Sequence, residues 1–135
     1  MRGEESDHIW FPPGTYYIGD PCYAIEDTDW MDYLDTYPKH SNPHIGWEDG
    51  FVVYKGYGCW QAGTAFGDGE YKDKQRRRYP VDAGLIGIIP VILCTQELLD
   101  NPSDYGLIKT FTKPFDVWVT DGGTFHFDNI TIPTG

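Results

Sequence analysis

Short apolar runs, each bounded by glycine or proline, recur along almost the whole chain. Glycine relieves the steric limits of a turn and proline cannot continue a backbone ladder, so each run ends after a few residues. Aromatic residues make up 16% of the sequence, which suits the pleated face of a sheet and argues against a disordered chain. We therefore expect a fold built from many short strands.

Alternation of apolar and polar residues predicts hairpins within 51–66 and 70–82. It predicts a third hairpin in the tail, from 115–120 to 124–132, with its turn at Asp121-Gly122-Gly123. The nearly continuous apolar run 85–89 indicates a strand with both faces covered.

Helical patterns are short by comparison. Trp30, Tyr33, Leu34 and Tyr37 recur at helical spacing before a proline, which favours core packing, and 95–100 fits one or two further turns. The expected fold is mainly β, a β-rich α+β domain: an antiparallel β-sandwich or curled sheet of about eight short strands with one or two short helices.

The 135 residues fit one domain, with a polar N-terminal arm at 1–8 and a globular domain at 9–135. Cys22, Cys59 and Cys94 have no metal-binding spacing, and their odd number without a signal peptide indicates reduced thiols in a cytoplasmic protein. The longest apolar run is too short to span a bilayer. No motif for a metal ion or a cofactor is present, so we expect neither.

Charge is unevenly distributed. The formal net charge is −11, yet half of the ten Lys and Arg residues lie within 72–78. Such an acidic surface repels duplex nucleic acid, whose binding needs several cations on phosphates. The expected partner is either a basic protein that docks on the acidic surface or a small phosphorylated ligand at the basic run.

Three aspartates each sit in a glycine-rich phrase: Asp20, Asp68 and Asp82. If the strand ends gather at one edge of a sheet, their carboxylates share one hollow and could divide acid and base duties or hold a divalent cation. The alternative is that each aspartate closes its own turn by accepting hydrogen bonds from backbone amides.

A ligand pocket is the second hypothesis. Four aromatic residues could stack a base or sugar, with Thr64 or Tyr71 orienting the substrate if the protein is an enzyme, and a run of arginines could clamp phosphate. The alternative for the run is a solvated hairpin tip that offsets the negative field. The candidate ligand-binding residues are Tyr17, Tyr23, Trp60, Thr64, Tyr71, Arg76, Arg77 and Arg78.

Three phrases occur in order: Tyr17-Ile18-Gly19-Asp20-Pro21-Cys22-Tyr23, Thr64-Ala65-Phe66-Gly67-Asp68-Gly69-Glu70-Tyr71 and Val81-Asp82-Ala83-Gly84-Leu85-Ile86-Gly87. They resemble a group of small, uncharacterised proteins encoded largely by bacteriophages. The resemblance covers about 14–90 and does not extend to the region from Thr95. It implies a phage accessory protein that acts in the infected cell, and it implies no catalytic residue.

The resemblance implies a protein that works by binding, which inhibits a host defence protein or sequesters a small signalling molecule. The basic run adds that this small ligand could be phosphorylated. One alternative is a small hydrolase of the phosphodiesterase or glycosidase type that uses Asp20, Asp68 and Asp82. Another is a structural virion or assembly protein. The edge of the tail hairpin could also support a homo-oligomer.

Overall fold

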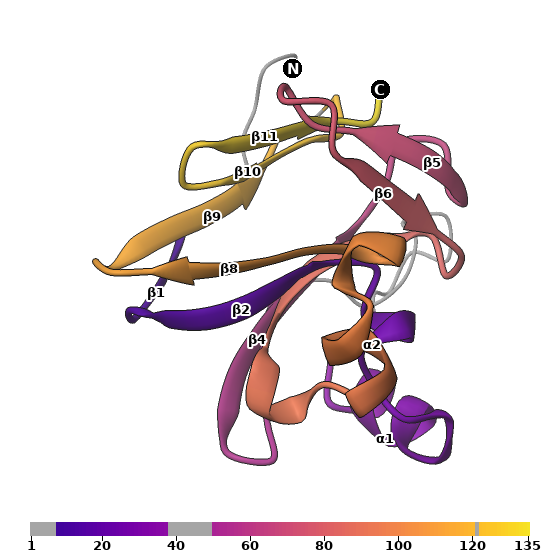
Figure 1. Cartoon of the computed structure of the whole chain (residues 1–135), viewed down its shortest axis with the longest axis vertical. Helices are drawn as coiled ribbons and strands as arrows, with labels where there is room; N and C mark the ends of the chain where they lie inside the picture. The colour runs from indigo at the N-terminus through magenta and orange to yellow at the C-terminus, as the bar shows by residue number, and fades with distance from the viewer. Residues whose placement is uncertain (1–7, 38–49, 121) are drawn as a thin grey trace.

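The computed structural model describes residues 8–37, 50–120 and 122–135, and it stacks two antiparallel sheets with a helical layer beneath them (Figure 1). The central sheet has the order β3-β4-β7-β2-β8 and the outer sheet the order β1-β9-β10-β11, while β5 and β6 form a separate hairpin. The strands are β1 Ile9–Phe11, β2 Gly14–Gly19, β3 Gly50–Tyr54, β4 Tyr57–Gly63, β5 Gly69–Lys72, β6 Arg78–Val81, β7 Leu85–Pro90, β8 Gly106–Phe111, β9 Phe115–Val119, β10 Thr124–Phe127 and β11 Ile130–Pro133.

The helical layer consists of short segments that follow β2 and β7. They are η1 Pro21–Tyr23, η2 Asp27–Asp29, α1 Trp30–Asp35, η3 Val91–Leu93, α2 Gln96–Asp100 and η4 Pro102–Asp104. In the described part of the chain, no helix is long and apolar enough to cross a membrane.

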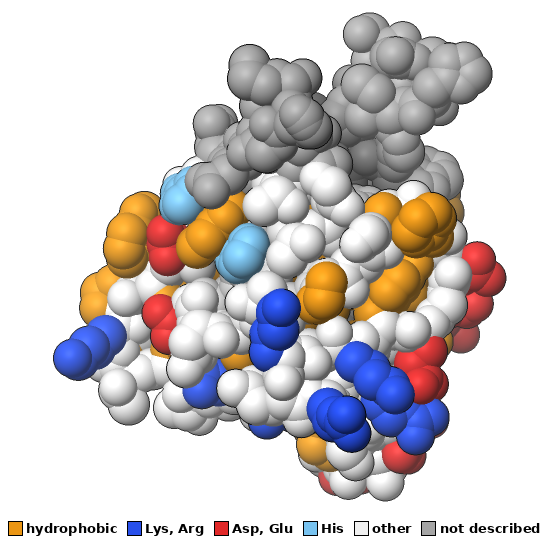
Figure 2. Space-filling model, turned by 90° about the horizontal axis from the view of Figure 1, so that it is seen from above, with side chains coloured by type: hydrophobic (Ala, Val, Ile, Leu, Met, Phe, Trp, Pro, Cys, Tyr) orange, Lys and Arg blue, Asp and Glu red, His pale blue; other side chains and the backbone are white. Residues whose placement is uncertain are grey.

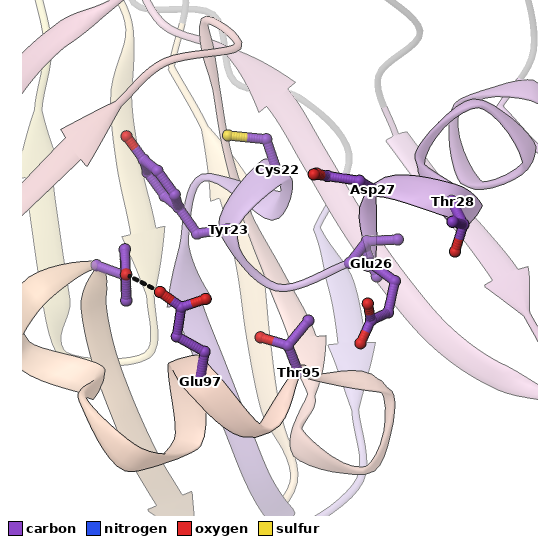
Figure 3. A pocket seen from close by; sticks show the side chains of 9 residues that line it. Cys22, Tyr23, Glu26, Asp27, Thr28, Thr95 and Glu97 are labelled. Carbon is purple, nitrogen blue, oxygen red and sulfur yellow. Dashed lines mark hydrogen bonds between the residues drawn. The ribbon is translucent and has the colours of Figure 1, made fainter.

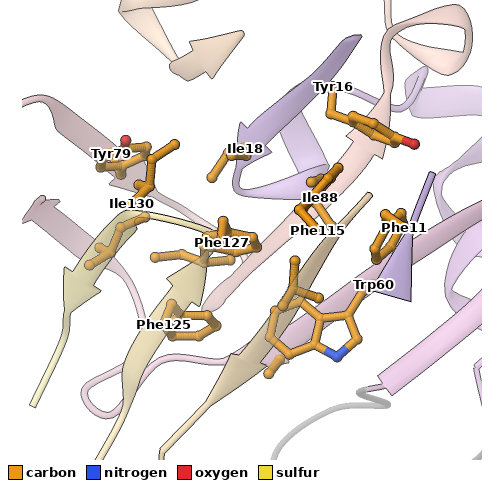
Figure 4. Packing of buried hydrophobic residues seen from close by; sticks show 14 of the residues in the cluster. Phe11, Tyr16, Ile18, Trp60, Tyr79, Ile88, Phe115, Phe125, Phe127 and Ile130 are labelled. Atoms are coloured by element: carbon orange, nitrogen blue, oxygen red, sulfur yellow. The ribbon is translucent and has the colours of Figure 1, made fainter. Parts of the chain in front are cut away.

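The sandwich core lies between the two sheets (Figure 4). Ile18, Trp60 and Ile88 of the central sheet face Phe125 and Phe127 of the outer sheet, and all five are nearly inaccessible to solvent. The indole of Trp60 meets both phenylalanine rings edge-on, at 6.0 and 5.8 Å between ring centroids. Such edge-to-face contacts stabilise the core beyond the area that they bury.

The opposite face of the central sheet packs on the helical layer. Along β7, Ile86 and Ile88 point into the sandwich, whereas Leu85 and Ile89 point toward the buried residues of α1 and α2. This alternation follows from the two-residue period of a strand. It confirms the prediction that the run 85–89 is covered on both faces.

Hydrogen-bonded side chains cross the core between the central sheet and the helical layer, which we call the helical-side core. The Tyr33 hydroxyl donates to Oε1 of Gln61 (2.8 Å) and lies 2.7 Å from the Tyr37 hydroxyl. Burial raises the pKa of Tyr33 well above its usual range. The aromatic stripe before Pro38 is therefore core packing, as predicted, and its hydroxyls tie α1 to β4.

The mainly β class is confirmed, but eleven strands form where about eight were expected. The expected tail strand 124–132 is split, because Asp128 adopts a left-handed backbone (φ 59°) and turns the chain between β10 and β11. Aspartate tolerates that conformation better than most residues do. β1 was not foreseen, and the expected N-terminal arm at 1–8 lies, except for His8, outside the described residues.

We expect Gly87→Ala to lower the free energy of unfolding by about 3 kcal/mol, the upper end of the usual cost of overpacking. A Cβ on Gly87 would clash with the carbonyl oxygen of Trp60 and lie 3.0 Å from Cβ of Gln61, in the middle of the central sheet. Gly122→Ala is the matched control, since nothing lies within 4 Å of its added Cβ. Urea unfolding of both variants measures the difference, and equal stabilities would contradict the packing described.

Candidate functional site

The three glycine-rich phrases meet around the turn between β6 and β7. Asp20 caps η1: its Oδ1 accepts a hydrogen bond from the amide of Cys22 (2.9 Å). Its Oδ2 accepts from the amides of Asp82 (2.8 Å) and Ala83 (2.7 Å). In the same turn, the carbonyl of Gly84 accepts from the amide of Thr64 (3.0 Å). The phrases are therefore joined by backbone contacts, with Asp20 at the centre.

Their carboxylates do not share a hollow. Asp20 is completely buried, whereas Asp68 and Asp82 are exposed. Burial raises the pKa of Asp20, and the amide hydrogen bonds from Cys22, Ala83 and Asp82 oppose that rise. Among the described residues, no three His, Cys, Asp or Glu side chains are arranged to hold a metal ion. Asp20 thus acts as a latch between two segments, which fits the turn-closing alternative.

The four aromatic candidates do not line one pocket. Tyr17 lies in the helical-side core and Trp60 in the sandwich core, on opposite faces of the central sheet. The Tyr17 hydroxyl is shared between the carbonyl oxygens of Asp20 (3.0 Å) and Tyr105 (2.8 Å). Tyr71 donates to the carbonyl of Gly67 (2.9 Å), beside the hydroxyl of Thr64. These side chains hold the fold together.

Tyr23 lines a different cavity, which we call the acidic hollow (Figure 3). It encloses about 370 Å³ between η1, η2 and α2, and its walls are Cys22, Tyr23, Ile25, Glu26, Asp27, Thr28, Thr95, Glu97 and Tyr105. The rings of Tyr23 and Tyr105 are 5.0 Å apart, and the Tyr105 hydroxyl donates to Glu97 (2.9 Å). Burial, together with Asp20 and Asp82, raises the pKa of the Cys22 thiol, so this thiol stays protonated at neutral pH. No sequence motif marks this hollow.

The three arginine candidates do share a cavity, the arginine hollow. It encloses about 380 Å³ and is lined by Arg76, Arg77, Arg78, Pro102, Ser103, Gly106, Leu107 and Ile108. The tip of the β5-β6 hairpin forms one wall, and η4 with the start of β8 forms the other. The basic run in the sequence predicted the arginines as ligand-binding residues. The second wall was not predicted, because it lies about 25 residues further along the chain and carries no recognisable motif.

Asp73 fixes the hairpin tip, and the sequence analysis gave it no role. Its Oδ1 accepts from the amides of Gln75 (2.8 Å) and Arg77 (2.9 Å), and its Oδ2 accepts from Nε of Arg77 (3.1 Å) and from the Tyr79 hydroxyl (2.7 Å). Its carboxylate side chain is completely buried. The amide pattern is that of an Asx turn, so an aspartate at the start of the loop was the available signal.

The arginines differ in how they are engaged. Arg78 makes two hydrogen bonds to Glu70, at 2.8 and 3.0 Å, in an exposed pair. Arg77 is oriented by Asp73 and also donates to Gln75 (3.2 Å). The side chain of Arg76 makes no hydrogen bond or ion pair with any described residue. Within the described ranges, the Arg76 guanidinium is therefore free and the other two are held in place.

Charge is segregated in space. The segments 20–35 and 91–104, which make up the helical layer, contain nine Asp and Glu and no Lys or Arg. Of the eight Lys and Arg in the described residues, seven lie on the β5-β6 hairpin or at 109–113, and Lys55 is the exception. Figure 2 shows Lys and Arg side chains spread across the lower half of one face. The net charge of −11 conceals this basic region.

Asp20→Asn is expected to lower the free energy of unfolding by about 3 kcal/mol. The new amide group would place a donor against backbone N–H groups, leaving buried donors unpaired, and hydrogen bonds to a charged group contribute about 1.5–3 kcal/mol each. Asp68→Asn and Asp82→Asn are controls from the same phrases; both side chains are exposed, so each change should stay within about 0.5 kcal/mol. Chemical denaturation of the three variants tests this, and a mild effect at Asp20 would refute the latch.

Asp73→Asn should destabilise the protein in a pH-dependent way. Burial alone would raise the pKa of Asp73, but hydrogen bonds from Tyr79, Arg77 and Gln75 and the charge of Arg77 hold it below its ordinary value. Its contribution to stability is therefore present above the unfolded pKa of about 3.9 and is lost as the pH falls through the lower folded value.

The difference in unfolding free energy between wild type and Asp73→Asn is expected to be about 2 kcal/mol at neutral pH, on the scale of one or two charged hydrogen bonds. It should shrink below about pH 4. Asp68→Asn, an exposed change beside the same hairpin, should show no such trend. Unfolding curves measured between neutral and acid pH test this expectation. A difference in unfolding free energy that widens on acidification would contradict a lowered pKa for Asp73.

Comparison with known proteins gives no further constraint. No protein-family model, curated protein or solved structure matches this chain. The resemblance of the three phrases to bacteriophage proteins therefore stays a prediction, and function has to be argued from the geometry of the two hollows.

Proposed function

We propose that this protein works by binding, and that its ligand carries phosphate and occupies the arginine hollow. The observation that carries the proposal is that Arg76, Arg77 and Arg78 all line one cavity of about 380 Å³. Guanidinium groups match the oxygens of phosphate and bind them through paired, charge-assisted hydrogen bonds. Leu107 and Ile108 supply an apolar wall, where such bonds are stronger than in open water.

The hairpin presents these arginines in a prepared geometry. Asp73 fixes the backbone on both sides of Arg76, which adopts a left-handed conformation (φ 71°) at the tip. The amide of Lys74 also donates to the carbonyl of Thr131 (3.2 Å), so the tip is bound to β11. A prepared site loses less conformational entropy when a ligand binds.

Existing ion pairs leave room for a ligand. The Arg78–Glu70 pair is exposed on both sides, and exposed pairs contribute at most about 1 kcal/mol. An incoming phosphate can therefore displace Glu70, whereas Asp73 is buried and stays in place to orient Arg77.

We take the biological role for this site from the resemblance to phage proteins. In this proposal the chain is an accessory protein in the cytosol of an infected bacterium, where it sequesters a small phosphorylated signalling ligand. A second candidate is docking on a basic host protein. The segregated helical layer favours it, because its eight acids that are not buried, with no cation among them, give a surface suited to fast, salt-sensitive association.

Arg76→Gln is expected to weaken binding of inorganic pyrophosphate about tenfold, the equivalent of one charge-assisted hydrogen bond. Lys55→Gln is a close control: Lys55 is also a cation with a left-handed backbone (φ 51°) in a hairpin turn, but it pairs with Asp29, away from the hollow. Isothermal titration calorimetry measures both affinities. Equal losses in the two variants would show that only net charge matters.

Glu70→Gln should instead tighten pyrophosphate binding several-fold, because it releases Arg78 without changing the hairpin backbone. Glu97→Gln removes the same charge from the acidic hollow and is the control. Titration of both variants at equal salt gives the comparison; no gain at Glu70, or the same gain at Glu97, would count against the site.

Exposure of the purified protein to host lysate tests binding against turnover. Mass spectrometry of material released by denaturation should recover an intact phosphorylated molecule that Arg76→Gln no longer retains. Recovery of a chemically altered product would favour a hydrolase. Recovery of a protein partner that the arginine variant still retains would favour docking through the acidic helical layer.

A further inference from the structure

We infer that the anion-binding surface continues from the arginine hollow along β8 to a second hollow, so that the ligand class is a linear chain of several linked phosphates. The inference rests on the proposed function, because the chain must begin at the arginines. It goes beyond that proposal by naming the length and shape of the ligand.

The second hollow lies at the turn between β8 and β9. It encloses about 240 Å³ and is lined by Lys109, Thr110, Phe111, Thr112, Lys113, Pro114, Phe115 and Asp128. The ammonium group of Lys109 lies 5.6 Å from the centre of the Phe111 ring, a cation–π contact. Two ammonium groups and the Thr112 hydroxyl give this lysine hollow donors for hydrogen bonds to phosphate oxygens, while the Thr110 hydroxyl lies 2.8 Å from that of Thr15. Asp128 is the acidic residue among its walls.

A single strand connects the two hollows. Gly106, Leu107 and Ile108 line the arginine hollow, and the next residues, Lys109 to Phe111, line the lysine hollow. β8 is the last strand of the central sheet and pairs within it with β2. From Leu107 to Phe111 the strand advances by about 13 Å, at about 3.3 Å per residue. That span is too long for pyrophosphate to reach both hollows, but a longer phosphate chain can.

The charges along this edge favour an extended anion. Arg76 to Arg78, Lys109 and Lys113 contribute five positive charges to the walls of the two hollows, and Asp128 contributes one negative charge. Glu70 and Asp73 lie beside the arginines and each pairs with one of them. The surplus is positive although the whole chain is strongly acidic. A linear row of phosphate groups can contact the cations of both hollows, whereas a compact dianion can contact only those of one.

The test compares short and long phosphate chains on the wild type and on Lys109→Gln/Lys113→Gln. The probes are pyrophosphate, a long linear polyphosphate, and single-stranded oligothymidylates from dinucleotide to decanucleotide. We expect the wild type to bind at least one of the long probes about tenfold or more tightly than pyrophosphate. The double lysine variant should lose that advantage yet bind pyrophosphate as the wild type does, and Lys55→Gln should behave like the wild type.

Salt dependence gives a second readout. For single strands, the slope of the logarithm of affinity against the logarithm of salt falls by about 0.7 for each phosphate contact removed. The double variant should therefore lower that slope by about 1.4 for the long probe and leave the slope for pyrophosphate unchanged. If the double variant does not fold, Lys113→Gln alone, at an exposed turn, should give about half the change in slope.

The outcomes separate the two proposals. A preference for polyphosphate identifies a free phosphate chain, and a preference for oligothymidylate identifies a nucleic-acid strand; either supports the inference if it depends on Lys109 and Lys113. If pyrophosphate binds through Arg76 but long probes gain nothing, the inference fails while the proposed function stands. If no probe depends on Arg76, the proposed function itself has failed.

Discussion

The buried carboxylate of Asp20 is the contact on which the arrangement of this molecule depends. It leaves water completely, and desolvating a carboxylate is expensive unless donors replace the lost hydration. Three backbone amides do so, one from η1 and two from the turn after β6, which is distant in sequence. The same contact ends β2 and fixes where β6 passes into β7. The glycine-rich phrases therefore specify how segments meet, and no reaction is needed to explain them.

Asp20 influences the proposed ligand site, the arginine hollow, through the β5-β6 hairpin. β6 is held at one end by the Asp20 latch and at the other by Asp73, which binds the amides of the loop that carries Arg76 and Arg77. Because both ends of β6 are fixed, the arginines keep their position relative to β8. Residues of β8 form part of the opposite wall of the arginine hollow. A polar residue far from the ligand can thus determine how well the site is prepared, which is the role that supporting hydrogen bonds have in other binding sites.

Sequence patterns predicted the strands and hairpins, because local periodicity controls these elements. The nearly continuous apolar run 85–89 identified a strand covered on both faces, and the hairpin containing 70–82 placed the basic run at its tip. Long-range placement was beyond such patterns. Tyr17 and Trp60 look equally suitable for stacking a ligand. Their side chains point to opposite faces of the central sheet, however, so each is buried in a different core. Asp20 and Asp68 follow glycine in similar phrases, but only tertiary contacts with Asp82 and Ala83 decide which carboxylate is buried. For the same reason, Leu107 and Ile108 could not be recognised as a wall.

Segregation of charge is what would allow this acidic protein to attract an anion, as proposed. At physiological ionic strength, exposed charges are screened beyond about 8 Å, so a ligand at the hairpin responds mainly to the nearby Arg and Lys residues. The acidic helical layer still acts on anything large enough to approach both regions. On this proposal, a rigid duplex would bring a wide band of phosphates against the acidic layer and be repelled, whereas a thin phosphate chain could follow the edge of β8 alone. The proposal therefore implies selection by ligand width, which arises from the separation of charges and needs no contact with a base.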